Sequence, residues 1–320
     1  MSQPQVRFAE AGERRIAYTS SGTGAPIVVL PVLKALGSYV QVITRSGGSV
    51  HFDQLADHFQ IIRFDRTNTG LSDRVPESFD LESMARDLDV LAECFKPEKL
   101  ILTGFRETCP YAIYWAATRP AGVRALILNT PFTAFAANDL LDARHSRALA
   151  YLADDWEFFT EVWALASIGN GTMRGLAPHI AEDLRLLTNA EEFRRQLDAI
   201  CDVDATEHLA HVSIPALVLH QTNRDIDGAW PPVSQIQLCA SRISGSQFVR
   251  VDGPQSQYQP IVDFLLGEDG EPAASRSTSF RTILFTDVVA STPLLTQLRD
   301  AKMREVMHDH DTLMEAAVTG

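Results

Sequence analysis

Residues 100–110 read Leu-Ile-Leu-Thr-Gly-Phe-Arg-Glu-Thr-Cys-Pro, and the first four residues form an apolar run that predicts a β-strand. Similar strand-like runs occur along the chain, separated by segments long enough for helices. They are Arg15–Tyr18, Ile27–Leu30, Ile61–Phe64, Ala125–Leu128, Ala216–Leu219 and Phe248–Val251. This alternation predicts a mostly parallel sheet with helices on both faces, which is a doubly wound α/β fold.

Helical spacing is clearest over Leu81–Phe95, where apolar residues recur on one side of the predicted helix. The alternation of strand-like and helical segments then stops between about residues 132 and 211. Helical segments such as Asp154–Ala166 and Glu191–Ile200 fill this interval. We expect these helices to form a cap over the sheet, and a cap commonly roofs a pocket.

Composition narrows the class of protein. The 320 residues fit one large α/β domain plus a fragment, with 45% hydrophobic and 22% charged residues. No run approaches the roughly 18 apolar residues of a membrane span, and the N-terminal residues lack the apolar core of a secretory signal. A cytoplasmic protein without a membrane partner is therefore predicted.

Charge and cysteine usage exclude two further classes. The formal net charge of −13 disfavours nucleic acid as a partner. Cys94, Cys109, Cys201 and Cys239 are scattered without paired spacing, which argues against a disulfide framework or a zinc site.

Three stretches together resemble the α/β-hydrolase family over roughly residues 5–266. They are Phe64-Asp-Arg-Thr-Asn-Thr-Gly-Leu-Ser-Asp73, Leu102-Thr-Gly-Phe-Arg-Glu-Thr-Cys-Pro110 and Pro215-Ala-Leu-Val-Leu-His220. The resemblance implies a nucleophilic serine on a sharp strand-to-helix turn of the form G-x-S-x-G. It also implies an acid after the late strand and a histidine after the last strand.

This chain departs from each of those positions. Arg106 stands where the nucleophile belongs, in Gly104-Phe-Arg-Glu-Thr108, and a protonated guanidinium cannot attack a carbonyl. The acid position aligns with Asn223-Arg224, which leaves Asp225 as a displaced substitute. The base position falls at Ser256, and the sequence has no histidine between His220 and His308. A degenerate triad, and hence a pseudo-hydrolase, is predicted.

Other residues near these positions have alternative interpretations. Arg106 and Glu107 either pair with each other or, with Ser256, line a pocket that binds an anionic small molecule beneath the cap. Cys109 either acts as a thiol nucleophile or packs against the helix that follows the turn. Pro31, in the turn after Ile27–Leu30, has no N–H to offer an oxyanion.

Outside the triad positions, structural roles are expected. Asp65, Arg66 and Asp73 are expected to hold their loop together, and His220 is expected to be a hydrogen-bonded core residue.

The composition changes after residue 267. Residues 268–279 are polar and read as a linker, and residues 280–320 begin a second domain. Thr282–Phe285 predicts a strand with Asp287 after its end. Ser291, Thr292 and the proline that follows them are typical of a helix start.

Residues 280–320 resemble the beginning of the class III nucleotide cyclases. The resemblance implies magnesium or manganese held by the Asp287 carboxylate and the Val288 carbonyl, with Ser291 and Thr292 near the nucleotide phosphates. It further implies ATP as substrate and a homodimer in the intact enzyme.

These resemblances predict a regulatory or sensor pseudo-hydrolase domain of a class III adenylate cyclase. The intact parent would convert ATP to cyclic AMP and pyrophosphate, whereas this chain alone would be catalytically silent. Two alternatives stay open at this point: an active esterase or related hydrolase with a rearranged site, and a non-catalytic dimerisation scaffold.

Overall fold

The computed structural model describes residues 5–12, 14–31, 40, 53–76, 79–96, 98–134, 151–168, 175, 177–222, 231–267 and 302. The chain divides into two units, Met1–Arg276 and Ser277–Gly320. All described residues except Lys302 belong to the first unit, and the fold below is that of the first unit.

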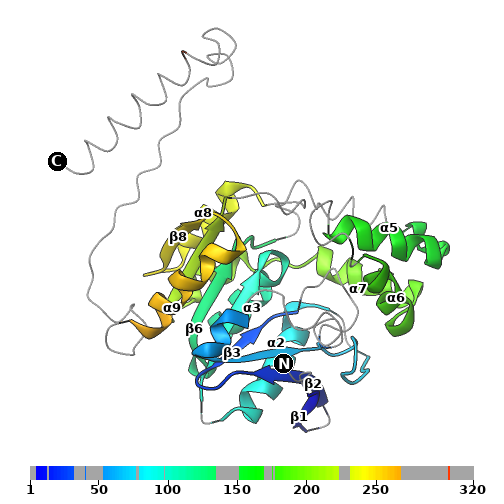
Figure 1. The fold of residues 1–320 in the computed structure, drawn as a ribbon, viewed down its shortest axis with the longest axis horizontal. Coiled ribbons are helices and arrows are strands. Elements are labelled where there is room, and N and C mark those ends of the chain that lie inside the picture. Colours follow the sequence, from blue (N-terminus) through cyan, green and yellow to red (C-terminus); the bar gives the residue numbers. More distant parts are fainter. Residues whose placement is uncertain are drawn as a thin grey trace. The chain divides into compact units, whose positions relative to one another are not determined.

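An eight-stranded sheet forms the centre of this unit, with the strand order β1-β2-β4-β3-β5-β6-β7-β8 (Figure 1). The strands are β1 Arg7–Ala11, β2 Arg14–Ser21, β3 Pro26–Val29, β4 Gln60–Phe64, β5 Leu100–Phe105, β6 Val123–Asn129, β7 Ala216–Gln221 and β8 Gln247–Val251. β2 pairs antiparallel with β1 and with β4, and the other neighbours are parallel. The predicted mostly parallel sheet is therefore confirmed.

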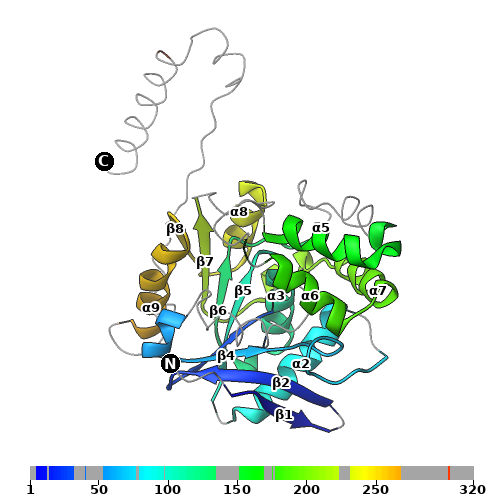
Figure 2. The ribbon, with the colours of Figure 1, turned by 45° about the vertical axis from the view of Figure 1, so that its right-hand side comes forward.

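Helices cover both faces of the sheet. α2 (Leu81–Cys94), α3 (Cys109–Thr118) and α8 (Val233–Arg242) contribute to one apolar core. α9 (Tyr258–Leu266) and the short helix η2 (Asp53–Asp57) contribute to the other core, and Figure 2 shows these two elements side by side. Successive side chains of a strand point to opposite faces of the sheet. A buried parallel strand therefore contributes apolar side chains to both cores.

The described segments between β6 and β7 are helical apart from short connections. They are η6 Tyr151–Asp154, α5 Trp156–Ile168, α6 Ala177–Leu187, α7 Ala190–Cys201 and η8 Thr206–His211. Three aromatic side chains of α5 and one of α7 form a cluster, with ring centroids 4.9–5.9 Å apart: Trp156, Phe159, Trp163 and Phe193. We refer to these described helical segments between β6 and β7 as the cap.

Two hydrogen bonds tie the cap to the loop after β4. Gln196 of α7 donates to the Asn68 carbonyl oxygen at 3.3 Å, and Arg74 donates to the Leu187 carbonyl oxygen at 3.3 Å. Within the described residues, no helix is both long enough and apolar enough to span a membrane.

Candidate functional site

The carboxyl ends of three strands carry unusual backbone conformations. Among the described residues, the non-glycine residues with positive φ are Asn68 (67°), Arg106 (50°) and Thr130 (51°). Arg106 and Thr130 directly follow β5 and β6, and Asn68 lies four residues beyond β4. Such conformations are strained in side chains with a Cβ, particularly in a β-branched threonine, and they concentrate at functional sites. This edge of the sheet is the candidate site.

A sharp turn joins β5 to α3 at the centre of this edge. A Cβ on Gly104 would lie 3.0 Å from the Cys109 Cα atom, so a larger residue would push the helix away from the strand at this close approach. The Phe105 amide donates to the Thr108 hydroxyl oxygen at 2.8 Å. Thr108 therefore stabilises the turn with its side chain. It stands at the position of the second glycine in the G-x-S-x-G pattern.

Arg106 and Glu107 form a buried charged pair on this turn. Arg106 is 6% exposed and Glu107 is 2% exposed, and the Arg106 Nε atom lies 3.9 Å from a Glu107 carboxylate oxygen. Burial lowers the pKa of Arg106, while the charge of Glu107 opposes that shift. The pair lies at the N-terminal end of α3, where the helix dipole favours negative charge.

A cluster of uncharged polar side chains lies beside the turn. Asn129 ends β6, Gln221 ends β7, and Gln257 follows β8 in the short helix η9 (Pro254–Gln257). The Gln257 side-chain oxygen accepts hydrogen bonds from the amide groups of Asn129 and Gln221, the latter at 3.4 Å. Thr130 donates to the Asn129 side-chain oxygen at 3.2 Å. We call these four residues the amide cluster.

The structure brings together some predicted site residues and separates others. Arg106 and Glu107 are in contact, as one interpretation of the sequence required. Ser256, predicted at the same pocket, is exposed, whereas its neighbour Gln257 is buried. The sequence-based alignment therefore missed Gln257 by one position.

The remaining predicted site residues lie outside the described part of the chain. They are Arg224, Asp225, Asp287, Val288, Ser291 and Thr292. The magnesium or manganese ion, the ATP and the homodimer that accompany them stay predictions. Among the described residues, no group of three or more His, Cys, Asp or Glu side chains is arranged to hold a metal ion.

Cys109 is not placed to act as a nucleophile. It is fully buried, and burial raises the pKa of its thiol well above the usual value. The thiol therefore stays protonated, and its Sγ atom lies 3.9 Å from the Asn129 carbonyl oxygen. Of the two interpretations of Cys109, packing against the helix is the one that fits.

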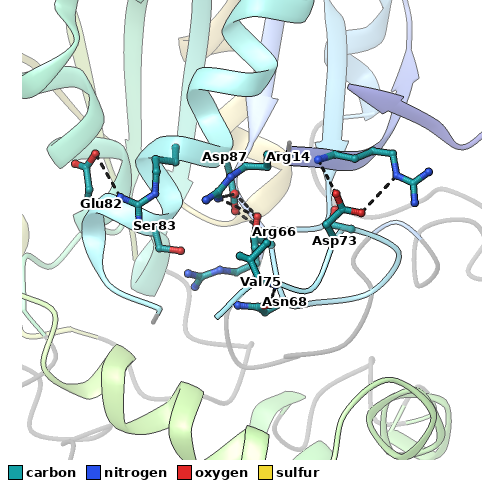
Figure 3. A network of polar contacts seen from close by, with 12 residues as sticks. Arg14, Arg66, Asn68, Asp73, Val75, Glu82, Ser83 and Asp87 are labelled. Atoms are coloured by element: carbon teal, nitrogen blue, oxygen red, sulfur yellow. Dashed lines mark hydrogen bonds and ion pairs between the residues drawn. The ribbon is translucent and has the colours of Figure 1, made fainter. Parts of the chain in front are cut away.

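The loop after β4 is held by a network of polar contacts (Figure 3). The Asp65 carboxylate accepts from the amides of Val40 and Leu71 at 3.0 and 2.9 Å, and the Asp73 carboxylate accepts from the Arg15 amide at 2.9 Å. The predicted loop-holding role of Asp65 and Asp73 is confirmed.

Arg66 contributes to the same loop in a different way. Its guanidinium lies 3.7 Å from the centre of the Phe79 ring, and none of its nitrogens has a hydrogen-bond partner within the described part of the chain. Nearby, the buried Asp87 carboxylate accepts from Arg14 at 2.5 Å and from the Thr67 amide at 2.8 Å. Arg66 therefore supports the loop by stacking on Phe79, near the Arg14–Asp87 ion pair.

Comparisons with known proteins give a likeness in structure only. No protein-family model matches the sequence, and no curated protein matches it. A hydrolase from Pseudomonas aeruginosa PA01 is similar over 81% of this chain and 98% of its own, with 19% identity and a TM-score of 0.62.

Two further structures give similar values. The enol-lactonase from Burkholderia xenovorans LB400 covers 81% of this chain and 96% of its own, with 18% identity and a TM-score of 0.60. MGS-M2, an α/β hydrolase enzyme from a Medee basin deep-sea metagenome library, covers 87% and 100%, with 14% identity and a TM-score of 0.62. The chain therefore has the α/β-hydrolase fold, as its sequence predicted.

The comparisons correct the functional prediction. These neighbours are hydrolases, and none of the comparisons supports a cyclase domain. The prediction of a regulatory pseudo-hydrolase domain of an adenylate cyclase is therefore wrong, and the alternative of an active hydrolase with a rearranged site agrees better. The turn itself is kept despite the substitutions: Arg106 has a φ of 50°, and the Phe105 amide donates a hydrogen bond to the Thr108 hydroxyl oxygen.

Proposed function

We propose that the chain is a hydrolase of small carboxylic esters or lactones, with a site rearranged around Arg106 and Glu107. In this proposal a water molecule attacks the substrate directly, and no covalent intermediate forms on the enzyme. The proposal needs one base and one group that stabilises negative charge, and these two neighbours on the turn supply both.

Glu107 is the proposed general base. As the water oxygen bonds to the carbonyl carbon, a water proton passes to the Glu107 carboxylate. The carbonyl oxygen becomes an oxyanion, and the Arg106 guanidinium and the N-terminal end of α3 stabilise its charge. When the carbon–oxygen bond to the leaving group breaks, Glu107 returns the proton to the departing alkoxide. The products are an acid and an alcohol, and the enzyme regains its starting state.

The observation that carries this proposal is the conformation of Arg106. A non-glycine residue at a φ of 50° is strained, and at 6% exposure the side chain is also largely removed from water. Strained backbone conformations concentrate at functional sites, so the strain and burial of Arg106 support a functional role for this residue. Its buried neighbour Glu107 places an acceptor for a proton next to this cation.

Ester hydrolysis by the purified full chain tests the proposal. The assay follows the release of p-nitrophenolate from p-nitrophenyl acetate and butyrate, and acid production from γ-butyrolactone. Glu107→Gln is expected to lower kcat by about 100-fold or more, because an amide cannot accept the proton. Arg106→Gln is expected to lower kcat by about 100- to 1,000-fold, because the oxyanion loses its charged donor.

Ser256→Ala is the matched control, because Ser256 is exposed and lies outside the buried pair. Its kcat is expected to match that of the wild type. Hydrolysis that is absent for all three substrates, or that is unchanged by both Glu107→Gln and Arg106→Gln, would overturn the proposal.

A further inference from the structure

Gln221 carries a buried hydrogen-bond acceptor that the described part of the chain leaves unused. The residue is 2% exposed, and its Oε1 atom has no hydrogen-bond partner among the described residues. Its other polar groups are engaged: Nε2 donates to the Gln257 oxygen at 3.4 Å, and the backbone amide donates to the Thr130 hydroxyl at 3.3 Å. Buried acceptors are normally paired, so this oxygen calls for a donor.

The neighbouring donors in the amide cluster already serve other acceptors. The Asn129 amide group donates to Gln257, and the Thr130 hydroxyl donates to Asn129. Among the described residues, the cluster therefore forms a chain of hydrogen bonds in which the Gln221 Oε1 atom accepts none. A ligand with an O–H or N–H group would complete the chain of hydrogen bonds.

The pairing of the strands gives the distance between Gln221 and Arg106. Phe105, just before Arg106, pairs with Asn129 of β6, and Asn129 pairs with Leu219 of β7. β5 and β7 are thus separated by one strand, and their backbones lie about 10 Å apart at the same edge of the sheet. One small molecule is long enough to reach both residues.

We infer that Gln221 is a specificity-determining residue that accepts a hydrogen bond from a hydroxyl or amide N–H of a substrate whose carbonyl group lies at Arg106. This inference rests on the proposed function and narrows its substrate class to esters that carry a donor group a few carbon atoms from the reacting carbonyl. The donor group binds in the ground state and in the transition state alike, so Gln221 acts mainly on affinity.

Equilibrium binding of two matched product-like probes tests the inference without requiring turnover. 6-Hydroxyhexanoate has a carboxylate for Arg106 and a hydroxyl for Gln221, and 6-methoxyhexanoate has the same carboxylate without the donor. By titration calorimetry, the wild-type chain is expected to bind the hydroxyl probe about threefold to tenfold more tightly. Gln221→Met is expected to abolish this preference and leave the affinity for the methoxy probe unchanged.

Two further variants keep the test interpretable. Gln221→Glu retains an acceptor of the same reach but loses the donor to Gln257 and adds a negative charge, so it is expected to bind both carboxylate probes more weakly while still preferring the hydroxyl probe. Gln60→Met makes the same substitution at the opposite end of the sheet, where the Gln60 amide donates to the Ser20 hydroxyl at 2.9 Å, and it should keep the wild-type preference. Thermal melts establish that each variant is folded.

The outcomes separate the two proposals. Equal affinity for both probes in the wild type, or binding of neither probe while p-nitrophenyl esters are hydrolysed, overturns the role of Gln221 and leaves the hydrolase proposal standing. A preference that Gln221→Met removes, found without any ester turnover, supports the role in recognition and overturns the hydrolase proposal.

Discussion

At the scale of single residues, Gly104 decides how closely β5 approaches α3. An added Cβ would lie 3.0 Å from the Cys109 Cα atom and 3.2 Å from its backbone nitrogen, and neither backbone atom moves easily. Gly104→Ala is therefore expected to lower the free energy of unfolding by about 1–3 kcal/mol, as overpacking does elsewhere. Urea unfolding measures this loss, and ester hydrolysis should fall with it because the same shift displaces Arg106.

Gly175→Ala is the matched control for that prediction. A Cβ at Gly175 would meet nothing within 4 Å, so the same chemical change adds no clash. Its free energy of unfolding is expected to stay within about 0.5 kcal/mol of the wild-type value. Equal losses for both variants would contradict the argument from close packing.

The same turn shows how far sequence could predict the site. The position of Arg106 was predictable because a short apolar strand ends one turn before a helix. The supporting bond from Thr108 was missed, although threonine hydroxyls commonly bond to nearby backbone. Gln257 could not be recognised, because its burial depends on contacts with Asn129 and Gln221, which come from distant parts of the chain. The comparison with the hydrolase motif instead assigned this position to Ser256, the residue before Gln257.

At the scale of elements, a polar clamp joins α2 to α3. The Glu82 carboxylate accepts from the Tyr114 hydroxyl and from Arg119, both at 2.7 Å. Burial alone would raise the pKa of Glu82, but the hydrogen bonds from Tyr114 and Arg119 outweigh it and leave the pKa lowered. The clamp thus stabilises the folded chain above the ordinary pKa of 4.5, and its contribution is lost as the pH falls through the lowered folded-state value.

Glu82→Gln tests this clamp. The variant is expected to lose about 0.5–1 kcal/mol of unfolding free energy at pH 7, a modest value because the carboxylate is partly exposed to water. The difference from wild type should shrink as the pH falls below 4.5. Urea unfolding across this pH range measures the difference. Glu93→Gln is the control, because Glu93 pairs on the surface with Lys96, just beyond the end of α2, and not with another helix. A difference that grows toward acid pH would contradict the assigned sign.

Strand prediction followed apolar residues in the sequence, and it found even β8, where Phe248, Val249 and Val251 are apolar but only Val251 is buried. β4 to β7 are buried along almost their whole length and appear in the sequence as apolar runs. β1 was not predicted, because Ala9 is its only fully buried residue and the strand is held by pairing with β2 at the edge of the sheet. Backbone pairing with β2, the next strand in the chain, leaves no apolar pattern to find.

At the scale of the whole first unit, the cap and the sheet share one apolar core. Phe159, Trp163 and Phe193 of the cap belong to the same buried cluster as the strand residues Leu126 and Val218. A single cooperative unit is the physical consequence, because opening the cap exposes surface that the sheet also needs to cover.

Phe193→Ala tests this coupling. The Phe193 ring lies 5.0 Å from Phe159 and 4.9 Å from Trp163, so truncation is expected to cost about 3–5 kcal/mol. Hydrogen exchange followed by mass spectrometry should show faster exchange in peptides from α5 and α7 and, by a similar factor, in peptides from β6 and β7. Phe158→Ala, at an exposed position on α5, should change neither set. Faster exchange confined to the cap would contradict the shared core, because the cap would then open while the sheet stays folded.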